Sequence, residues 1–289
     1  MVHDLSQVSQ LILAELQMPE VEELLAQGEP GRLPFVDLPV LACRALGGGG
    51  EGAFAAEAAM ACLSLAAVVL DDVLDEDRQG PLPMGREAVI AAALLMAGAR
   101  LAARVGVAMV ELYAETMLAV LRGELAAGSE WAAVVAQKTE PVFGAFFKAG
   151  ALLAGADEEV GERLFAWGRR LGRLVQMWDD MVDAFAWPPS GDWRNRDNLL
   201  LQLMPAGGEW EACLAGAGHD ESLVRRGQEL LIESGVLAEV VRRWLMEWQL
   251  WQAELGQLEV ADEGPLRKVV DEVGRAFRTW LGRLVMARG

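Results

Sequence analysis

The sequence predicts an all-α protein, and three observations support that class. Alanine, leucine, glutamate and arginine are abundant among the 289 residues, of which 53% are hydrophobic. Apolar residues recur at i, i+3, i+4 and i+7 along almost the whole chain, the spacing that forms one face of a helix. Alternating runs of β-branched residues, which would indicate strands, are absent. We therefore expect a bundle of about ten or more helices, folded as a single domain over residues 1–289.

Glycine and proline clusters divide the chain into its helical segments. None of these clusters is long or polar enough to be an interdomain linker. The helices expected between them cover residues 4–17, 34–46, 52–76, 85–107, 108–127, 129–153, 157–186, 195–205, 221–233, 235–257 and 265–287. Two of them, 52–76 and 157–186, are apolar on most faces, so they should lie at the centre of the bundle.

The net charge of −18 restricts the possible partners. A strongly acidic protein repels nucleic acids, so we expect no nucleic-acid partner. It can hold an anionic substrate only through a metal ion or a local basic cluster. Only three of the 25 basic residues are lysines, namely Lys138, Lys148 and Lys268, so the position of each one is informative.

The longest apolar stretches, residues 53–70 and 88–110, are interrupted by Glu57 and by Arg100 and Arg104. They indicate buried helices, and we do not expect an integral membrane protein. The three cysteines are scattered, and the N-terminus has no pattern of a secretion signal. These features are typical of a cytoplasmic protein.

Two acidic clusters lie at the ends of the two most apolar segments. They are Asp71-Asp72-Val73-Leu74-Asp75 and Asp179-Asp180-Met181-Val182-Asp183, and both spell Asp-Asp-x-x-Asp. On a helix the first and last Asp of each cluster share a face, and the middle one is turned away by about 100°. Burying such like-charged pairs without a partner would be strongly unfavourable.

A solvated helix end would explain one such cluster. Two clusters about a hundred residues apart, each on a very apolar helix, favour a metal site instead. Their position at the helix C-termini also argues against simple capping, because carboxylates there oppose the helix dipole. The ligands would be oxygen atoms, with few histidines and no thiolates nearby. That set favours Mg²⁺ over zinc.

The two motifs resemble those of the trans-isoprenyl diphosphate synthases, the polyprenyl synthetase family within the class I terpenoid synthase fold. The resemblance extends over roughly residues 30–200 and includes Leu41–Gly48, Arg78-Gln79-Gly80, Gly123-Glu124-Leu125, Lys138-Thr139, Gly150–Gly155, Gly168–Gly172 and Gln176. It implies helices around a central apolar cavity and an enzyme that binds an allylic prenyl diphosphate through three Mg²⁺ ions. Family members are usually homodimers, so a homodimer is expected.

The resemblance also implies roles for single residues. Asp71 and Asp75 would hold two ions and Asp179 the third, supported by Asp183. The catalytic set would be completed by Asp72 and Asp180, and the diphosphate would contact Arg78, Lys138 and Gln176. The prenyl pocket would be lined by Ala66, Ala67, Leu70, Thr139, Phe143, Phe146 and Phe147. The small Ala66 and Ala67 would admit a tail of roughly C15–C20 or longer, although close helix packing explains these alanines equally well.

The chain departs from the family where isopentenyl diphosphate (IPP) would bind. The family's Gly-Gly-Lys-Arg-x-Arg-Pro motif corresponds to residues 30–36, where only Arg32 remains. Gln79 replaces the second Arg of the family's Arg-Arg-Gly motif, and Leu70 replaces the His that commonly stands just before the first aspartate motif. Arg194 and Arg196 are candidate substitutes. A dianionic head group needs several charge-assisted contacts of about 1.5–3 kcal/mol each, so losing three or four should abolish useful affinity.

Several functions stay open at this point. The first is ionisation of an allylic diphosphate for cyclisation, coupling or transfer without IPP. The second is ordinary chain elongation, with an IPP site rebuilt around Arg32, Arg194 and Arg196. A non-catalytic partner subunit is less favoured because both aspartate motifs are intact. Metal-dependent hydrolysis of a diphosphate is also compatible with these residues.

Overall fold

The computed structural model describes residues 5–18, 21, 35–50, 52–74, 83–126, 130–187, 193, 198–216 and 220–286. Every regular element within these residues is a helix, which confirms the all-α class. The helices are α1 (Leu5–Leu16), α3 (Leu38–Ala45), α4 (Ala53–Leu74), α5 (Met84–Val105), α6 (Val107–Leu125), α7 (Trp131–Lys138), α8 (Glu140–Ala154), α9 (Glu158–Ala184), α11 (Leu199–Leu203), α12 (Gly208–Gly216), α13 (Glu221–Glu233), α14 (Val236–Leu255) and α15 (Gly264–Met286).

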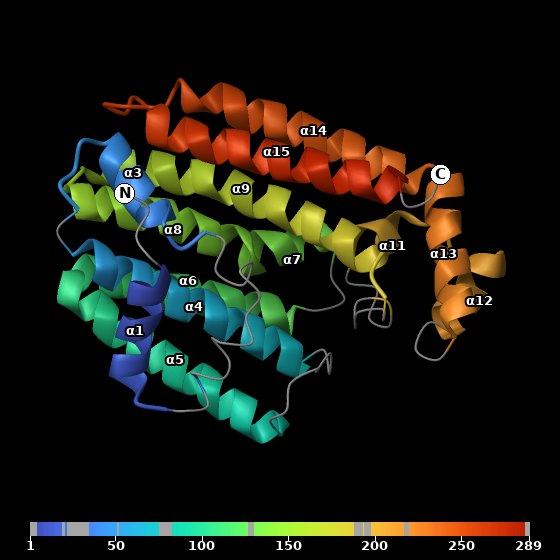
Figure 1. Ribbon diagram of the computed structural model, residues 1–289, viewed down its shortest axis with the longest axis horizontal. Coiled ribbons are helices and arrows are strands. Elements are labelled where there is room, and N and C mark those ends of the chain that lie inside the picture. Colours follow the sequence, from blue (N-terminus) through green and yellow to red (C-terminus); the bar gives the residue numbers. More distant parts are fainter. Residues whose placement is uncertain are drawn as a thin grey trace.

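The helices pack in layers (Figure 1). Helices α14 and α15 run side by side along one edge, α8 and α9 lie next to them, and α4, α5 and α6 form the opposite side with α1. Helix α8 is the most enclosed of the long helices, since eleven of its fifteen residues are buried. The expectation that 157–186 is apolar on most faces is wrong, because α9 buries one face against α8 and α14 and carries arginines on another. Helix α4 lies inside the bundle as expected.

Helices α8 and α9 approach each other through glycine. A Cβ atom on Gly168 would lie 2.5 Å from the carbonyl oxygen of Phe143, and one on Gly172 would lie 2.8 Å from Cα of Glu140. Only the absence of a side chain allows this backbone contact. The contact fixes the position of α9, and with it the second acidic cluster, relative to the start of α8.

The single helix expected over 129–153 is wrong. Helix α7 ends at Lys138 and α8 begins at Glu140, with Thr139 between them. Pro141 lies in the first turn of α8, where no N–H is needed; inside one continuous helix it would remove a hydrogen bond and clash with the preceding turn. Helix α12 lies in a segment where no helix was predicted.

Aromatic side chains attach α14 and α15 to α9. The indole N–H of Trp167 donates to the carbonyl oxygen of Trp251 (3.0 Å), and the Trp251 indole donates to that of Trp167 (3.1 Å). Their rings stack with centroids 4.7 Å apart. The ring of Trp244 stacks on Phe277 at 3.6 Å. The three helices therefore form one tightly packed side of the bundle.

Two helices, α4 and α5, are long and apolar enough to cross a membrane by length and composition alone. In the structure they pack against each other, and 67% of the apolar window of α4 is buried within the protein. Burial in the core accounts for the apolar character of α4. The three cysteines are buried and free.

Candidate active site

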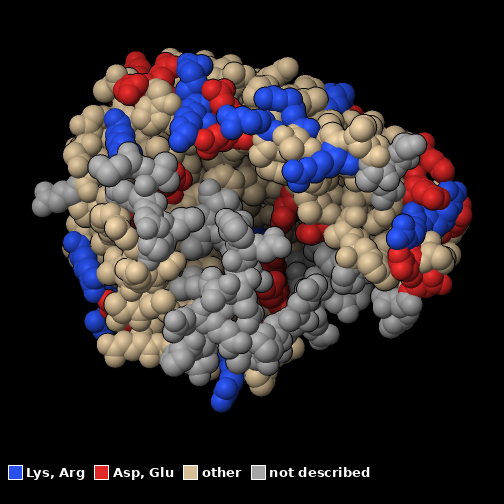
Figure 2. All heavy atoms as spheres, viewed as in Figure 1, with Lys and Arg blue, Asp and Glu red and all other residues tan. Residues whose placement is uncertain are grey.

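Side chains from both acidic clusters lie close together. Asp71, near the end of α4, forms an ion pair with Lys138 at the end of α7. Asp179 of α9 is near enough for the charges of Asp71 and Lys138 to act on its pKa. Figure 2 shows a hollow near the middle of one face of the molecule, with acidic side chains inside it. Three helices thus bring two carboxylates and one ammonium group into one site.

The pKa of Asp179 is raised to about 6. Surrounding protein atoms are the main cause because they disfavour the charged form, and the negative charge of Asp71 adds to the effect; Lys138 opposes it. Asp179 is nevertheless exposed to solvent. The two carboxylates together carry more negative charge than Lys138 can compensate.

Lys138 lies between two carboxylates. Its Nζ atom pairs with Asp71 and lies 3.2 Å from a carboxylate oxygen of Glu124 on α6. Burial alone would lower the pKa of Lys138, but the two carboxylates outweigh it and raise the pKa above the ordinary value. A Cβ atom on Gly123 would lie 2.9 Å from the backbone nitrogen of Lys138, so α6 approaches α7 closely here. Glu124 belongs to the Gly123-Glu124-Leu125 motif of the family resemblance, but its contact with Lys138 was not predicted.

Asp180, predicted as a catalytic residue, is buried in a hydrogen-bond network. Its carboxylate accepts from the indole of Trp131 (2.6 Å), from Nε2 of Gln176 (2.8 Å) and from the backbone N–H of Leu199 (2.8 Å). Thr139 donates to Oε1 of Gln176 at 2.6 Å. Asp180 therefore links α7, α9 and α11, and Gln176, predicted to bind diphosphate, belongs to the same network.

Asn198 completes this network and was missed by the sequence analysis. Its Nδ2 group donates to the carbonyl oxygen of Asp180 at 2.7 Å, and its Oδ1 atom caps α11 by accepting from Leu200 N–H at 3.0 Å. An Asn before a short apolar run is a cap signal, but no local pattern indicates its contact with α9.

The predicted pocket residues lie in the apolar interior. Ala66 is buried, whereas Ala67 and Leu70 are partly buried. The ring of Phe143 packs edge to face against Phe146 (6.0 Å). Phe147 instead meets Trp167 edge to face at 4.9 Å, so it packs towards the aromatic side of α9 and α14.

Some predicted residues cannot be placed. Asp75, Arg78, Arg32, Arg194 and Arg196 lie outside the described residues. Asp72 and Asp183 are described, and both are partly buried, on α4 and α9 respectively.

Asp71 and Asp179 are two of the described carboxylates that could take part in a Mg²⁺ site. Among the described residues no three His, Cys, Asp or Glu side chains form a group that could hold a metal ion. Mg²⁺ is usually held by one or two carboxylates together with substrate phosphates, rather than by a cage of protein ligands. Asp71 and Asp179 fit that pattern, because they offer oxygen ligands whose combined negative charge exceeds the positive charge of Lys138.

Comparison with known proteins identifies similar sequences. The family profile described as polyprenyl synthetase matches residues 36–190, more than half of the chain. The geranylgeranyl diphosphate synthase of Methanosarcina mazei is 45% identical over 58 residues. That match covers 20% of this chain and only 18% of the relative.

Solved structures show the same fold. A decaprenyl diphosphate synthase from Rhodobacter capsulatus matches with a TM-score of 0.77 and 22% identity over 94% of both chains. A polyprenyl synthase from Caulobacter crescentus CB15, complexed with calcium and isoprenyl diphosphate, matches with a TM-score of 0.80 and 23% identity over 93% of this chain and 92% of that one. At such identities the likeness establishes the fold alone.

Proposed function

Because the chain belongs to the polyprenyl synthetase family, we propose that it is a Mg²⁺-dependent enzyme that ionises an allylic prenyl diphosphate and releases pyrophosphate. The observation that supports this proposal is the meeting of Asp71, Asp179 and Lys138 from three helices. Up to three Mg²⁺ ions, held by Asp71, Asp75 and Asp179 with support from Asp183, would supply Lewis-acid stabilisation of the leaving pyrophosphate.

The chain's own residues would bind and orient the substrate. Lys138 stays protonated because two carboxylates raise its pKa, so it offers a permanent positive charge to a diphosphate oxygen. Arg78 would add a second cation. The allylic cation that ionisation creates must be kept from water, and the apolar side chains of Ala66, Phe143 and Phe146 are suited to that purpose.

We propose that the ionised substrate is cyclised, coupled or transferred without IPP. The departures of this sequence support that choice, since Gln79 and Leu70 replace two groups of the family's IPP site and Arg32 alone remains of a third. Chain elongation is the second candidate. It is favoured by the names of the relatives, which include geranylgeranyl and decaprenyl diphosphate synthases.

The test is incubation of the purified protein with Mg²⁺ and geranyl, farnesyl or geranylgeranyl diphosphate, each with and without IPP. Pyrophosphate release is measured together with the products. Hydrocarbon, alcohol or transfer products that form without IPP are expected. Longer diphosphates that form only with IPP would establish elongation instead, and no pyrophosphate release from any substrate would overturn both candidates in favour of a partner subunit.

A further inference from the structure

The face formed by α14 and α15 carries a charge opposite to that of the whole chain. Together the two helices contain seven basic residues, six of them arginines, and five acidic residues. Their net charge is therefore +2, and the rest of the chain has −20. Glu239 pairs with both Arg242 and Arg243 on α14. Among the described residues no ion pair holds Arg275, Arg278 or Arg283, so the uncompensated positive charge lies on α15.

The same two helices expose large apolar side chains. Met246 and Leu250 on α14 are 50% and 51% exposed, and Val285 and Met286 at the end of α15 are 64% and 84% exposed. The helices lie side by side at the outer edge of the bundle (Figure 1), and the guanidinium group of Arg278 lies 5.6 Å above the ring of Trp248 where they meet. Positive charge and apolar groups are therefore mixed on one surface.

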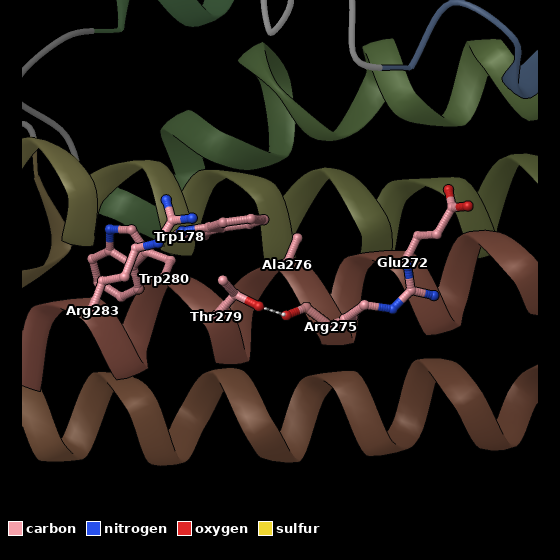
Figure 3. A pocket seen from close by; sticks show the side chains of 7 residues that line it. All are labelled: Trp178, Glu272, Arg275, Ala276, Thr279, Trp280 and Arg283. Atoms are coloured by element: carbon pink, nitrogen blue, oxygen red, sulfur yellow. Dashed lines mark hydrogen bonds between the residues drawn. The ribbon is translucent and has the colours of Figure 1, made fainter.

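A groove lies between α15 and α9 (Figure 3). Its volume is about 510 Å³, and its lining includes Trp178, Arg275, Trp280 and Arg283. The indole N–H of Trp178 is buried and makes no hydrogen bond with any of the described residues. The groove also contains one carboxylate, Glu272, so it combines two indole rings with two cationic groups and one anionic group. Tryptophan and arginine side chains are both suited to the interface of a bilayer.

We propose that the α14–α15 face docks on a membrane surface rich in anionic phospholipid. Arginines near such a surface are attracted to its negative potential, while the exposed Met, Leu and Val side chains enter the headgroup region. The remaining chain has a net negative charge, which such a surface repels, and this favours docking through the α14–α15 face. Trp178 faces α15 whereas its neighbour Asp179 lies near Asp71, so docking would leave the carboxylate site uncovered.

The experiment is sedimentation of the full chain with vesicles of phosphatidylcholine alone or with 30% phosphatidylglycerol (a chosen composition), at low salt and at high salt. Binding is expected only with phosphatidylglycerol, and high salt should release it. Arg275→Glu/Arg283→Glu should lower the partition coefficient by at least about 30-fold, since each arginine contributes roughly a factor of five. Neither arginine belongs to the candidate active site.

The matched control is Arg86→Glu/Arg225→Glu, which changes the net charge equally on exposed residues of α5 and α13. It should bind vesicles with a partition coefficient within about threefold of wild type, a difference of about 0.7 kcal/mol in binding free energy. Equal binding to both vesicle types, no binding to either, or equal loss in both double variants would overturn the proposal. Self-association without lipid that Arg275→Glu/Arg283→Glu abolishes would show that a second copy covers the face, and would overturn it as well.

Discussion

Lys138 has two acidic partners that differ in burial. The side chain of Asp71 is 36% exposed, whereas that of Glu124 is 7% exposed. If Asp71 becomes a metal ligand, Glu124 is the partner that remains to hold Lys138 in place. We therefore regard Glu124 as a positioning residue for the diphosphate-binding cation.

Glu124→Gln should slow pyrophosphate release by about 10- to 100-fold, because a charge-assisted contact is worth roughly 1.5–3 kcal/mol. The loss should appear in kcat more than in KM, since Lys138 would act on the leaving group. Steady-state kinetics with a single allylic diphosphate measures this split. Glu115→Gln, an exposed change on the same helix, is the control and should match wild type; equal rates for both variants would refute the role of Glu124.

Asp179 makes the ligand-free protein sensitive to pH. Its pKa is raised from 3.8 to about 6, so between these values the folded protein binds more protons than the unfolded chain. Stability therefore falls as pH rises through this window. Asp179→Asn should raise the melting temperature by about 2 °C at pH 8, a modest gain because solvent contact screens the charge, and by less at pH 4.5.

Thermal unfolding of both proteins at pH 4.5 and pH 8, without Mg²⁺, tests this expectation. Asp271→Asn on the exposed face of α15 serves as the control for loss of one negative charge. If Asp179→Asn melts at a lower temperature than wild type at pH 8, the surroundings stabilise the charged carboxylate and do not raise its pKa.

At the scale of elements, periodicity predicted most helices but not the break at Thr139. The apolar face continues across the break, so the spacing alone gives one helix, and only Pro141 indicates a new start. The missed α12 is short and begins at Gly208, which obscures its pattern. Helix boundaries thus depended on single glycine and proline residues.

The candidate site was predictable only in part. Helical geometry correctly turned Asp180 away from Asp179, and the structure buries it. Its partner Trp131 lies 49 residues away, and Lys138 lies 67 residues from Asp71, so neither contact leaves a local signal. Such pairs form because α7, α8 and α9 pack together, which no short sequence pattern encodes.

The packing of α9 on α8 should tolerate no side chain at Gly172. In Gly172→Ala the new methyl group would meet backbone atoms of Thr139 and Glu140, so the helices must separate. We expect a loss of about 1–3 kcal/mol in the free energy of unfolding. Urea denaturation measures it. Gly282→Ala, where nothing lies near the added group, should be neutral or stabilising by up to about 1 kcal/mol, and equal effects at both sites would contradict the close approach.

At the scale of the whole molecule, apolar side chains remain exposed on a second surface. Helix α6 exposes Leu118, Leu121 and Leu125, which share one face because they are three and four residues apart. Its neighbour α5 exposes Val89 and Met96. We propose that this surface joins two copies of the chain, the homodimer that the family resemblance implies.

Size-exclusion chromatography with light scattering tests the dimer. The wild-type protein should have twice the 31.2 kDa mass of one chain at micromolar concentration. Leu118→Glu would place a charge in the buried centre of the contact, where an unpaired carboxylate is strongly unfavourable, so the variant should elute as a folded monomer. Ile232→Glu on α13 changes a residue of comparable exposure away from this surface and should stay dimeric. A monomeric wild type, or dissociation in both variants, would show that α5 and α6 do not form the interface, because the effect would then not depend on where the charge is placed.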